Sequence, residues 1–103
     1  MLDSVIIDAV RYAILRVKEP LILEGRACNA VVEYNMAQIK ILEGGNIGEG
    51  NAAKLLMHEI VHALLFERGM TEASADEELI SELAAGFVNL VRANPQLITF
   101  LQK

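Results

Sequence analysis

Residues 55–67 read LLMHEIVHALLFE, a stretch that we predict to be a mostly apolar helix with three ionisable side chains in its middle. These are His58, Glu59 and His62, and the two histidines are the only ones in the chain. Together they form one H-E-x-x-H motif. The motif is typical of a helical zinc site, but the same string also occurs by chance in unrelated proteins. The residues around it therefore have to show whether it is a zinc site here.

The helical setting allows the two imidazoles to bind one ion. Residues four apart on an α-helix lie about 40° apart around the axis and one turn apart along it, so His58 and His62 can converge. Glu59 lies about 100° from His58, in a sector with apolar residues. These residues are Ala52, Leu55, Ala63 and Phe66.

Two explanations of the motif place different demands on Glu59. An exposed polar stripe accounts for Lys54 and the histidines, but it leaves a carboxylate in an apolar sector, where burial without a partner is costly. A metal site accounts for all three residues. Neutral imidazoles then hold Zn²⁺, an open coordination position holds water, and Glu59 is the catalytic base. We therefore expect a zinc site, with the polar stripe as the alternative.

The residues after the motif narrow the class of zinc site. A metzincin continues with a glycine at position 65 and a third histidine at position 68, whereas this chain has Leu65 and Arg68. Since no histidine remains, we expect the third ligand to be a carboxylate on the following helix, as in gluzincins.

Glu77 is the carboxylate that we expect to be this third ligand. It lies at the border of the apolar face of the second predicted helix, whereas Glu78 and Glu82 project towards water. A rival explanation is a capping box, in which Glu77 reaches back to the amide of Ser74.

Two helices are predicted in the C-terminal half. Asn51 is expected to cap the first, which runs to about Arg68, where Gly69 supplies a left-handed terminator. After a short connection, the second runs from about Ala75 to Ala93 and ends before a proline. The apolar tail QLITFL at 96–101 should pack on the domain or in a homodimer interface, with blockage of the cleft as a third option.

The N-terminal half is predicted to form strands. Apolar and polar residues roughly alternate over 28–34 and 38–42, which predicts a hairpin with its turn at Asn35-Met36. Residues 4–18 suit a helix or strands, and their β-branched content favours strands. The glycine-rich stretch 44–51 lacks a following Gly-Lys-Ser/Thr, so we interpret it as a loop and not as a phosphate site.

Length and composition predict one globular domain over residues 1–103, with 53% hydrophobic and 22% charged residues. A net charge of −5 without a cationic stripe argues against direct binding of nucleic acid. No apolar run is long enough for a membrane span, and no basic segment begins a signal peptide. The lone Cys28 cannot form an internal disulfide, and we interpret it as a small buried residue. These features predict a cytoplasmic protein.

The order of a strand hairpin, then LLMHEIVHALLFERG, then DEELISELAAGFVNLVRANPQLI resembles the small zincin-like proteins of phages and prophages related to the ImmA/IrrE metallopeptidase group. The chain is also similar in size to the minigluzincins. The resemblance covers about residues 28–98 and is specific at the H-E-x-x-H motif. It implies a zinc-dependent peptidase, and it implies an edge strand at residues 37–43 that binds an extended peptide substrate.

We therefore expect an α+β, minimal zincin-like domain, in which a small antiparallel sheet packs on the H-E-x-x-H helix and the second helix backs it. Tyr12, Arg26 and Tyr34 are the candidates for stabilising the oxyanion of the transition state. The alternative function is a metal-binding or structural phage protein that keeps the scaffold without turnover. Glu59 favours the peptidase, because hydrolysis needs this carboxylate and metal binding does not.

Overall fold

The N-terminal half of the chain forms β-strands, as its content of Val and Ile predicts. The computed structural model describes residues 2–43 and 49–103. Its strands are β1 (Ser4–Ile7), β2 (Val10–Val17), β3 (Leu21–Leu23), β4 (Arg26–Cys28), β5 (Ala30–Glu33) and β6 (Gln38–Leu42). The preference for strands over a helix in residues 4–18 is therefore confirmed.

The main sheet has four strands and is mixed, so the expectation of an antiparallel sheet is wrong. The strands lie in the order β1-β2-β6-β5. Within the hairpins β1–β2 and β5–β6 the pairing is antiparallel, which confirms the hairpin expected over residues 28–42. Between the hairpins, however, β2 and β6 are parallel, with Ile14 opposite Ile39. Alternating polarity predicts a hairpin locally, but it does not indicate which strands of two hairpins will meet.

The connections between strands agree only partly with the sequence analysis. The turn expected at Asn35-Met36 is confirmed as a short 3-10 helix, η1 (Tyr34–Met36). An unexpected second ribbon forms where β3 pairs with β4. Of the loop expected at 44–51, residues 44–48 lie outside the described residues, and residues 49–51 are helical.

The helices are α1 (Glu49–Glu67), α2 (Thr71–Ser74), α3 (Glu77–Ala93) and α4 (Pro95–Leu101). Asn51 lies inside α1, so its predicted role as the cap is wrong, whereas Gly69 follows α1 with φ 75°, as expected of a left-handed terminator. Asp76 caps α3, because its side chain accepts a hydrogen bond from the amide of Leu79 at 3.1 Å. Among the described helices, none has the length and apolarity needed to cross a bilayer.

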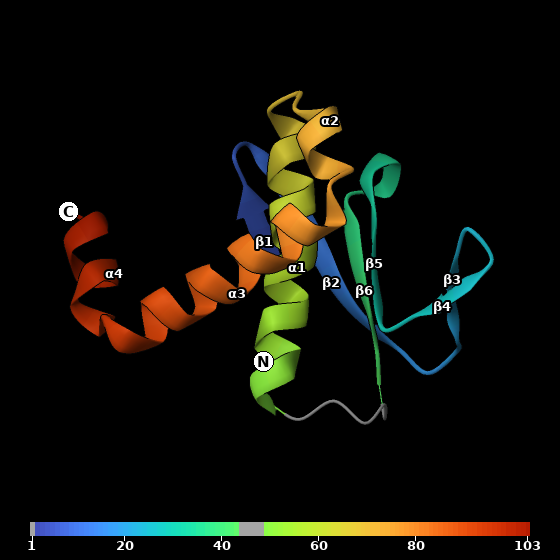
Figure 1. Ribbon diagram of the computed structural model, residues 1–103, viewed down its shortest axis with the longest axis horizontal. Helices are drawn as coiled ribbons and strands as arrows, with labels where there is room; N and C mark the ends of the chain where they lie inside the picture. Colours follow the sequence, from blue (N-terminus) through green and yellow to red (C-terminus); the bar gives the residue numbers. More distant parts are fainter. Residues whose placement is uncertain (1, 44–48) are drawn as a thin grey trace.

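Helix α1 lies between the sheet and α3 (Figure 1). On the sheet side, Ala63 packs with the buried residues Ile7, Tyr12 and Ile39. On the opposite side, Val61 of α1 packs with Ile80 and Ala84 of α3. The first cluster fixes α1 on the sheet, and the second fixes the first half of α3 on α1.

The C-terminal tail does not pack on the body of the domain, so the first of its two expected packings is wrong, whereas packing in a homodimer interface stays a prediction. Tail residues form α4, which contacts the end of α3 and points away from the sheet (Figure 1). Phe100 is 70% exposed and Leu101 is 65% exposed. None of the tail residues lines the cavity between β5, α1 and α3, so the tail does not block it.

Candidate metal centre

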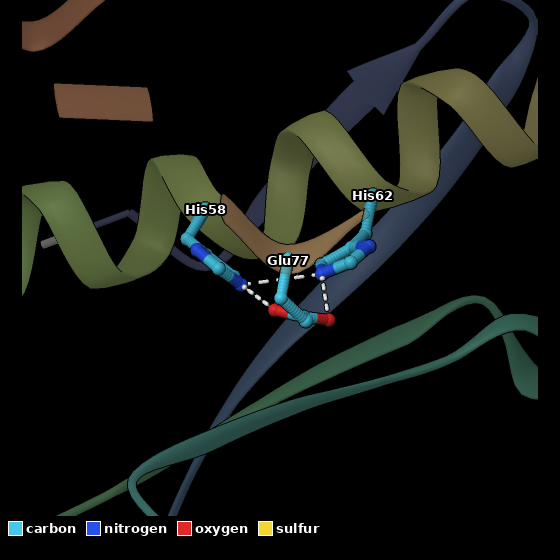
Figure 2. Close-up of side chains that lie close together, drawn as sticks. All are labelled: His58, His62 and Glu77. Carbon is cyan, nitrogen blue, oxygen red and sulfur yellow. Dashed lines mark hydrogen bonds and ion pairs between the residues drawn. The ribbon is translucent and has the colours of Figure 1, made fainter. Parts of the chain in front are cut away.

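Three side chains from two helices converge on one point (Figure 2). His58 and His62 project from α1, and Glu77 from the first turn of α3. The two Nε2 atoms are 3.1 Å apart, Glu77 Oε2 lies 3.0 Å from Nε2 of His58, and Glu77 Oε1 lies 3.0 Å from Nε2 of His62. The carboxylate therefore faces both imidazoles at once.

This triangle of atoms has the dimensions of a zinc site. With bonds of about 2.0–2.1 Å, two ligand atoms of a tetrahedral zinc ion are about 3.3 Å apart. The three separations of 3.0 to 3.1 Å are close to this value. Two imidazole nitrogens at 3.1 Å repel each other if both lone pairs are free, and either a proton or a metal ion between them would remove this repulsion. The donor set of two imidazoles and one carboxylate fits Zn²⁺.

The packing of α3 on α1 explains why Glu77 reaches the histidines. Gly69 ends α1 and lets the chain reverse, and α3 then begins at Glu77 itself. The first turn of α3 is held against α1 through Ile80, which is fully buried. The capping box between Ser74 and Glu77 is wrong, because Asp76 is the cap and the carboxylate of Glu77 turns towards the imidazoles.

The other two candidate carboxylates remain apart from the histidines. Glu78 and Glu82 are exposed and do not belong to the His58, His62 and Glu77 group. The Glu77 side chain is itself 67% exposed, so it closes the centre from the solvent side. Its role as a metal ligand stays a prediction, but its position is the one that this role requires.

Glu59 is buried beside the two histidines, with only 7% of its surface exposed. Burial, and to a smaller extent the negative charge of Glu77, raise the pKa of Glu59 to about 7. A carboxyl with a pKa near neutrality can both take up and release a proton at neutral pH. Glu59 therefore has the properties of a general base.

The lowered pKa of His62 is compatible with metal binding. Burial lowers the pKa of His62, and the charge of Glu77 opposes this shift only in part. The imidazole therefore stays neutral at lower pH than a free histidine, and only a neutral imidazole can bind a metal ion.

A cavity of about 870 Å³ opens in front of these residues. Its walls come from β5, from the ribbon of β3 and β4, and from the facing sides of α1 and α3; Glu59, both histidines and Glu77 are among the lining residues. Cys28 also lines it and is only half-buried, which corrects its assignment as a buried residue. The volume suffices for a short stretch of polypeptide.

The strand beside this cavity is β5, and not the segment 37–43 that was expected to form the edge. β6 occupies most of that segment and lies inside the sheet, between β2 and β5. The parallel pairing with β2 covers its other side. β5 is therefore the edge strand that faces α1 across the cavity.

No family model, no curated protein and no solved structure matches this chain.

The structure separates the three candidates for transition-state stabilisation. Tyr12 is fully buried in the core, where its hydroxyl donates a hydrogen bond to Glu67 Oε2 at 2.6 Å. It does not line the cavity and has no exposed surface, so it cannot contact a substrate bound there and this candidate is wrong. Arg26 and Tyr34 both line the cavity. The Tyr34 ring is further fixed by stacking on Phe66, with ring centroids 4.3 Å apart.

Proposed function

We propose that the chain is a zinc-dependent peptidase of the gluzincin type, with a zincin-like domain. The observation that carries this proposal is the convergence of Nε2 of His58, Nε2 of His62 and the Glu77 carboxylate, with the buried Glu59 next to them. A structural zinc site has no need of a buried carboxylate that does not itself coordinate the metal. A hydrolytic site needs one as its base.

The residues of this chain then have distinct roles. When bound, Zn²⁺ supplies the Lewis acid that acidifies water and polarises the scissile carbonyl. Glu59 would take the proton from the attacking water and return it to the leaving amine. Tyr34 or Arg26 donates a hydrogen bond to the oxyanion from the cavity wall.

The substrate in this proposal is an extended peptide that pairs with β5. The amide of Leu42 donates a hydrogen bond to the carbonyl of Asn29, so the backbone groups of Asn29 point at β6. In an antiparallel pair every second residue does the same, which here means Val31 and Glu33. By alternation, the N–H and C=O groups of Ala30 and Val32 point away from β6, towards the open edge of the sheet. A peptide bound there would lie along the cavity in front of Glu59.

The resemblance to the ImmA/IrrE group is part of the same proposal. It rests on the H-E-x-x-H motif and on the order of elements around it. The geometry of the centre supports it, because a carboxylate of the helix after the motif lies where a gluzincin has its third ligand.

Metal content tests the first step of the proposal. Purified wild-type protein should contain close to one zinc ion per chain, and the His58→Ala variant should contain much less, because it loses one of three protein ligands. If the wild type holds no more zinc than the variant, the peptidase proposal fails.

Cleavage of a mixed peptide library tests the second step. Glu59→Gln should keep its zinc and lose cleavage, whereas Glu82→Gln, which changes an exposed carboxylate of α3, should keep both. Cleavage that survives in Glu59→Gln would remove this residue from the role of base. A wild type that binds zinc but cleaves nothing would instead favour the alternative, a metal-binding protein without turnover.

A further inference from the structure

Two serine hydroxyls contact the metal-site imidazoles on the side opposite to Glu77. Ser74 Oγ, at the end of α2, is 3.0 Å from Nδ1 of His62. Ser81 Oγ, on α3, is 3.3 Å from Nδ1 of His58. Each imidazole therefore has its Nε2 at the convergent centre and its Nδ1 next to a hydroxyl.

The contacts of His58 come from successive turns of α3. Glu77 and Ser81 are four residues apart, so they lie on the same face of the helix, one turn from each other. Glu77 reaches Nε2 of His58 and Ser81 reaches Nδ1 of the same ring. These two contacts fix the rotation of the ring about its Cβ–Cγ bond.

The surroundings of Ser74 are compatible with a hydrogen bond in which Nδ1–H of His62 is the donor. Ser74 Oγ also lies 3.5 Å from the backbone carbonyl of His62, an atom that can only accept. If the hydroxyl donates its proton to this carbonyl, its lone pairs are free to accept from Nδ1–H of His62. That tautomer leaves Nε2 without a proton and directs its lone pair at the convergent centre.

We propose that Ser74 and Ser81 are positioning residues for the metal ligands, each holding one histidine in the tautomer that binds through Nε2. This inference rests on the proposed metal centre and adds to it the partners that orient the ligands. Both residues come from the segment 74–81, which also supplies Glu77. Docking of this one segment on α1 therefore places one proposed ligand, Glu77, and orients the other two, His58 and His62.

A neutral hydroxyl in this position differs chemically from a carboxylate. A carboxylate on Nδ1 makes the imidazole a stronger base and adds negative charge, whereas a hydroxyl fixes the ring with little change in charge. The centre already has two carboxylates, Glu59 and Glu77, near the ligand nitrogens. The serines thus orient the imidazoles without adding negative charge to the centre.

Zinc affinity in competition with a chelator tests this inference. Ser74→Ala should bind zinc about 10–100-fold more weakly than wild type, as expected when a ligand loses its orienting partner, and Ser81→Ala should show a smaller loss because its contact is longer and more exposed. Ser74→Thr, which keeps the hydroxyl, should restore most of the affinity. Thr71→Ala, on the same short helix, is the matched control and should bind as wild type does.

A second measurement separates orientation from general stability. In the zinc-bound wild type, nuclear magnetic resonance should show a slowly exchanging Nδ1 proton on both histidines, and the proton of His62 should exchange faster in Ser74→Ala. If Ser74→Ala fails to fold, Ser81→Ala carries the test on His58. Wild-type affinity in both alanine variants would overturn the inference alone, whereas a wild type that binds no zinc would overturn the proposed function and the inference together.

Discussion

Glu77 combines exposure with a defined direction, which is unusual for a surface glutamate. It is the first residue of α3, where the helix dipole favours a negative charge by about 0.3–1 kcal/mol, and an ordinary role would end there. Its contacts at 3.0 Å with two imidazoles indicate the additional role of a ligand. Loss of a metal ligand and loss of a favourable charge at a helix start have effects of different size, so substitution of Glu77 can distinguish the two roles.

Zinc titration of Glu77→Gln against Glu78→Gln makes this distinction. Loss of a metal ligand should weaken binding by more than the roughly 10–100-fold that follows loss of a ligand's hydrogen-bond partner. Loss of a favourable charge at a helix start should cost less than about 1 kcal/mol of stability and leave zinc bound. Glu78→Gln is the control, because Glu78 is exposed on the same turn. Equal affinity in the two variants would contradict the assignment of Glu77.

The raised pKa of Glu59 predicts how the stability of the metal-free protein depends on pH. Between pH 4.5 and about 7, the folded protein keeps a proton on Glu59 that the unfolded chain releases. Raising the pH through this window therefore favours unfolding, by about 3 kcal/mol in total. Above pH 7 the full cost of the buried carboxylate remains.

The Glu59→Gln variant removes this dependence. In the presence of a chelator, it should match wild type in urea unfolding at pH 4.5 and exceed it by up to about 3 kcal/mol at pH 8. The lowered pKa of His62 changes stability in the opposite direction, but it acts in both proteins and cancels in their difference. Equal stability at pH 8 would show that Glu59 carries no such cost.

The sequence predicts candidate site residues where the relation between them is local. His58, Glu59 and His62 lie within one helical turn or so, and the apolar face of α3 was enough to prefer Glu77 to its neighbours. The hydroxyls of Ser74 and Ser81 were missed because their role depends on the rotation of α3 against α1. The only signal was their spacing of three and four residues around Glu77, and serine at such spacing is common.

At the scale of elements, β5 is the part of the sheet on which the substrate proposal depends. Val32→Pro tests it, because the amide of Val32 points away from β6 and its loss leaves the ladder to β6 intact. This variant should fold and bind zinc as wild type does, yet cleave peptides at least about tenfold more slowly, since one hydrogen bond of about 1 kcal/mol is lost and the ring obstructs the edge.

Val31→Pro places the same substitution one residue earlier, on an amide that points at β6, and serves as the comparison for Val32→Pro. The amide of Val31 points at β6, and its side chain is buried, so this substitution should unfold the hairpin. If Val32→Pro cleaved peptides as fast as wild type, the substrate would have to bind elsewhere in the cavity.

The elements themselves show what periodicity can predict. Strands, two long helices and the Gly69 terminator follow from local patterns and were recovered. The parallel pairing of β2 with β6 was not, because a mixed and an antiparallel sheet require the same alternation of polar and apolar residues. Helix α2 was missed for another reason: four residues are too short to show a helical period.

At the scale of the whole molecule, charge is divided unevenly between the body and the C-terminal arm, by which we mean residues 83–103. The arm contains Arg92 and Lys103 but no Asp or Glu. Since the chain has a net charge of −5, residues 1–82 carry −7. The arm also has many exposed apolar residues: Leu83, Phe87, Leu90, Val91, Ile98, Phe100 and Leu101.

This distribution favours a second copy of the chain as the partner of the arm. A two-fold interface brings each patch against itself, so the patch has to tolerate its own charges. The acidic body of one copy repels that of another, whereas two arms meet with only two cations each and with apolar surface between them. The arm projects away from the sheet in Figure 1, so two arms can meet while the bodies remain apart.

We therefore expect a dimer whose formation depends on the arm, measurable as a concentration-dependent mass by sedimentation equilibrium. Phe100→Glu and Leu90→Glu should each weaken the dimer at least about tenfold, because the substitution places like charges opposite each other across the two-fold axis. Ile22→Glu, an equally exposed apolar position on β3, is the control and should leave the mass unchanged. Zinc affinity should be the same in all these variants, because none of the three substituted residues lines the cavity at the metal centre. A wild type that stays monomeric up to concentrations of about 1 mM, where even weak interfaces associate, would leave the exposed arm without this explanation.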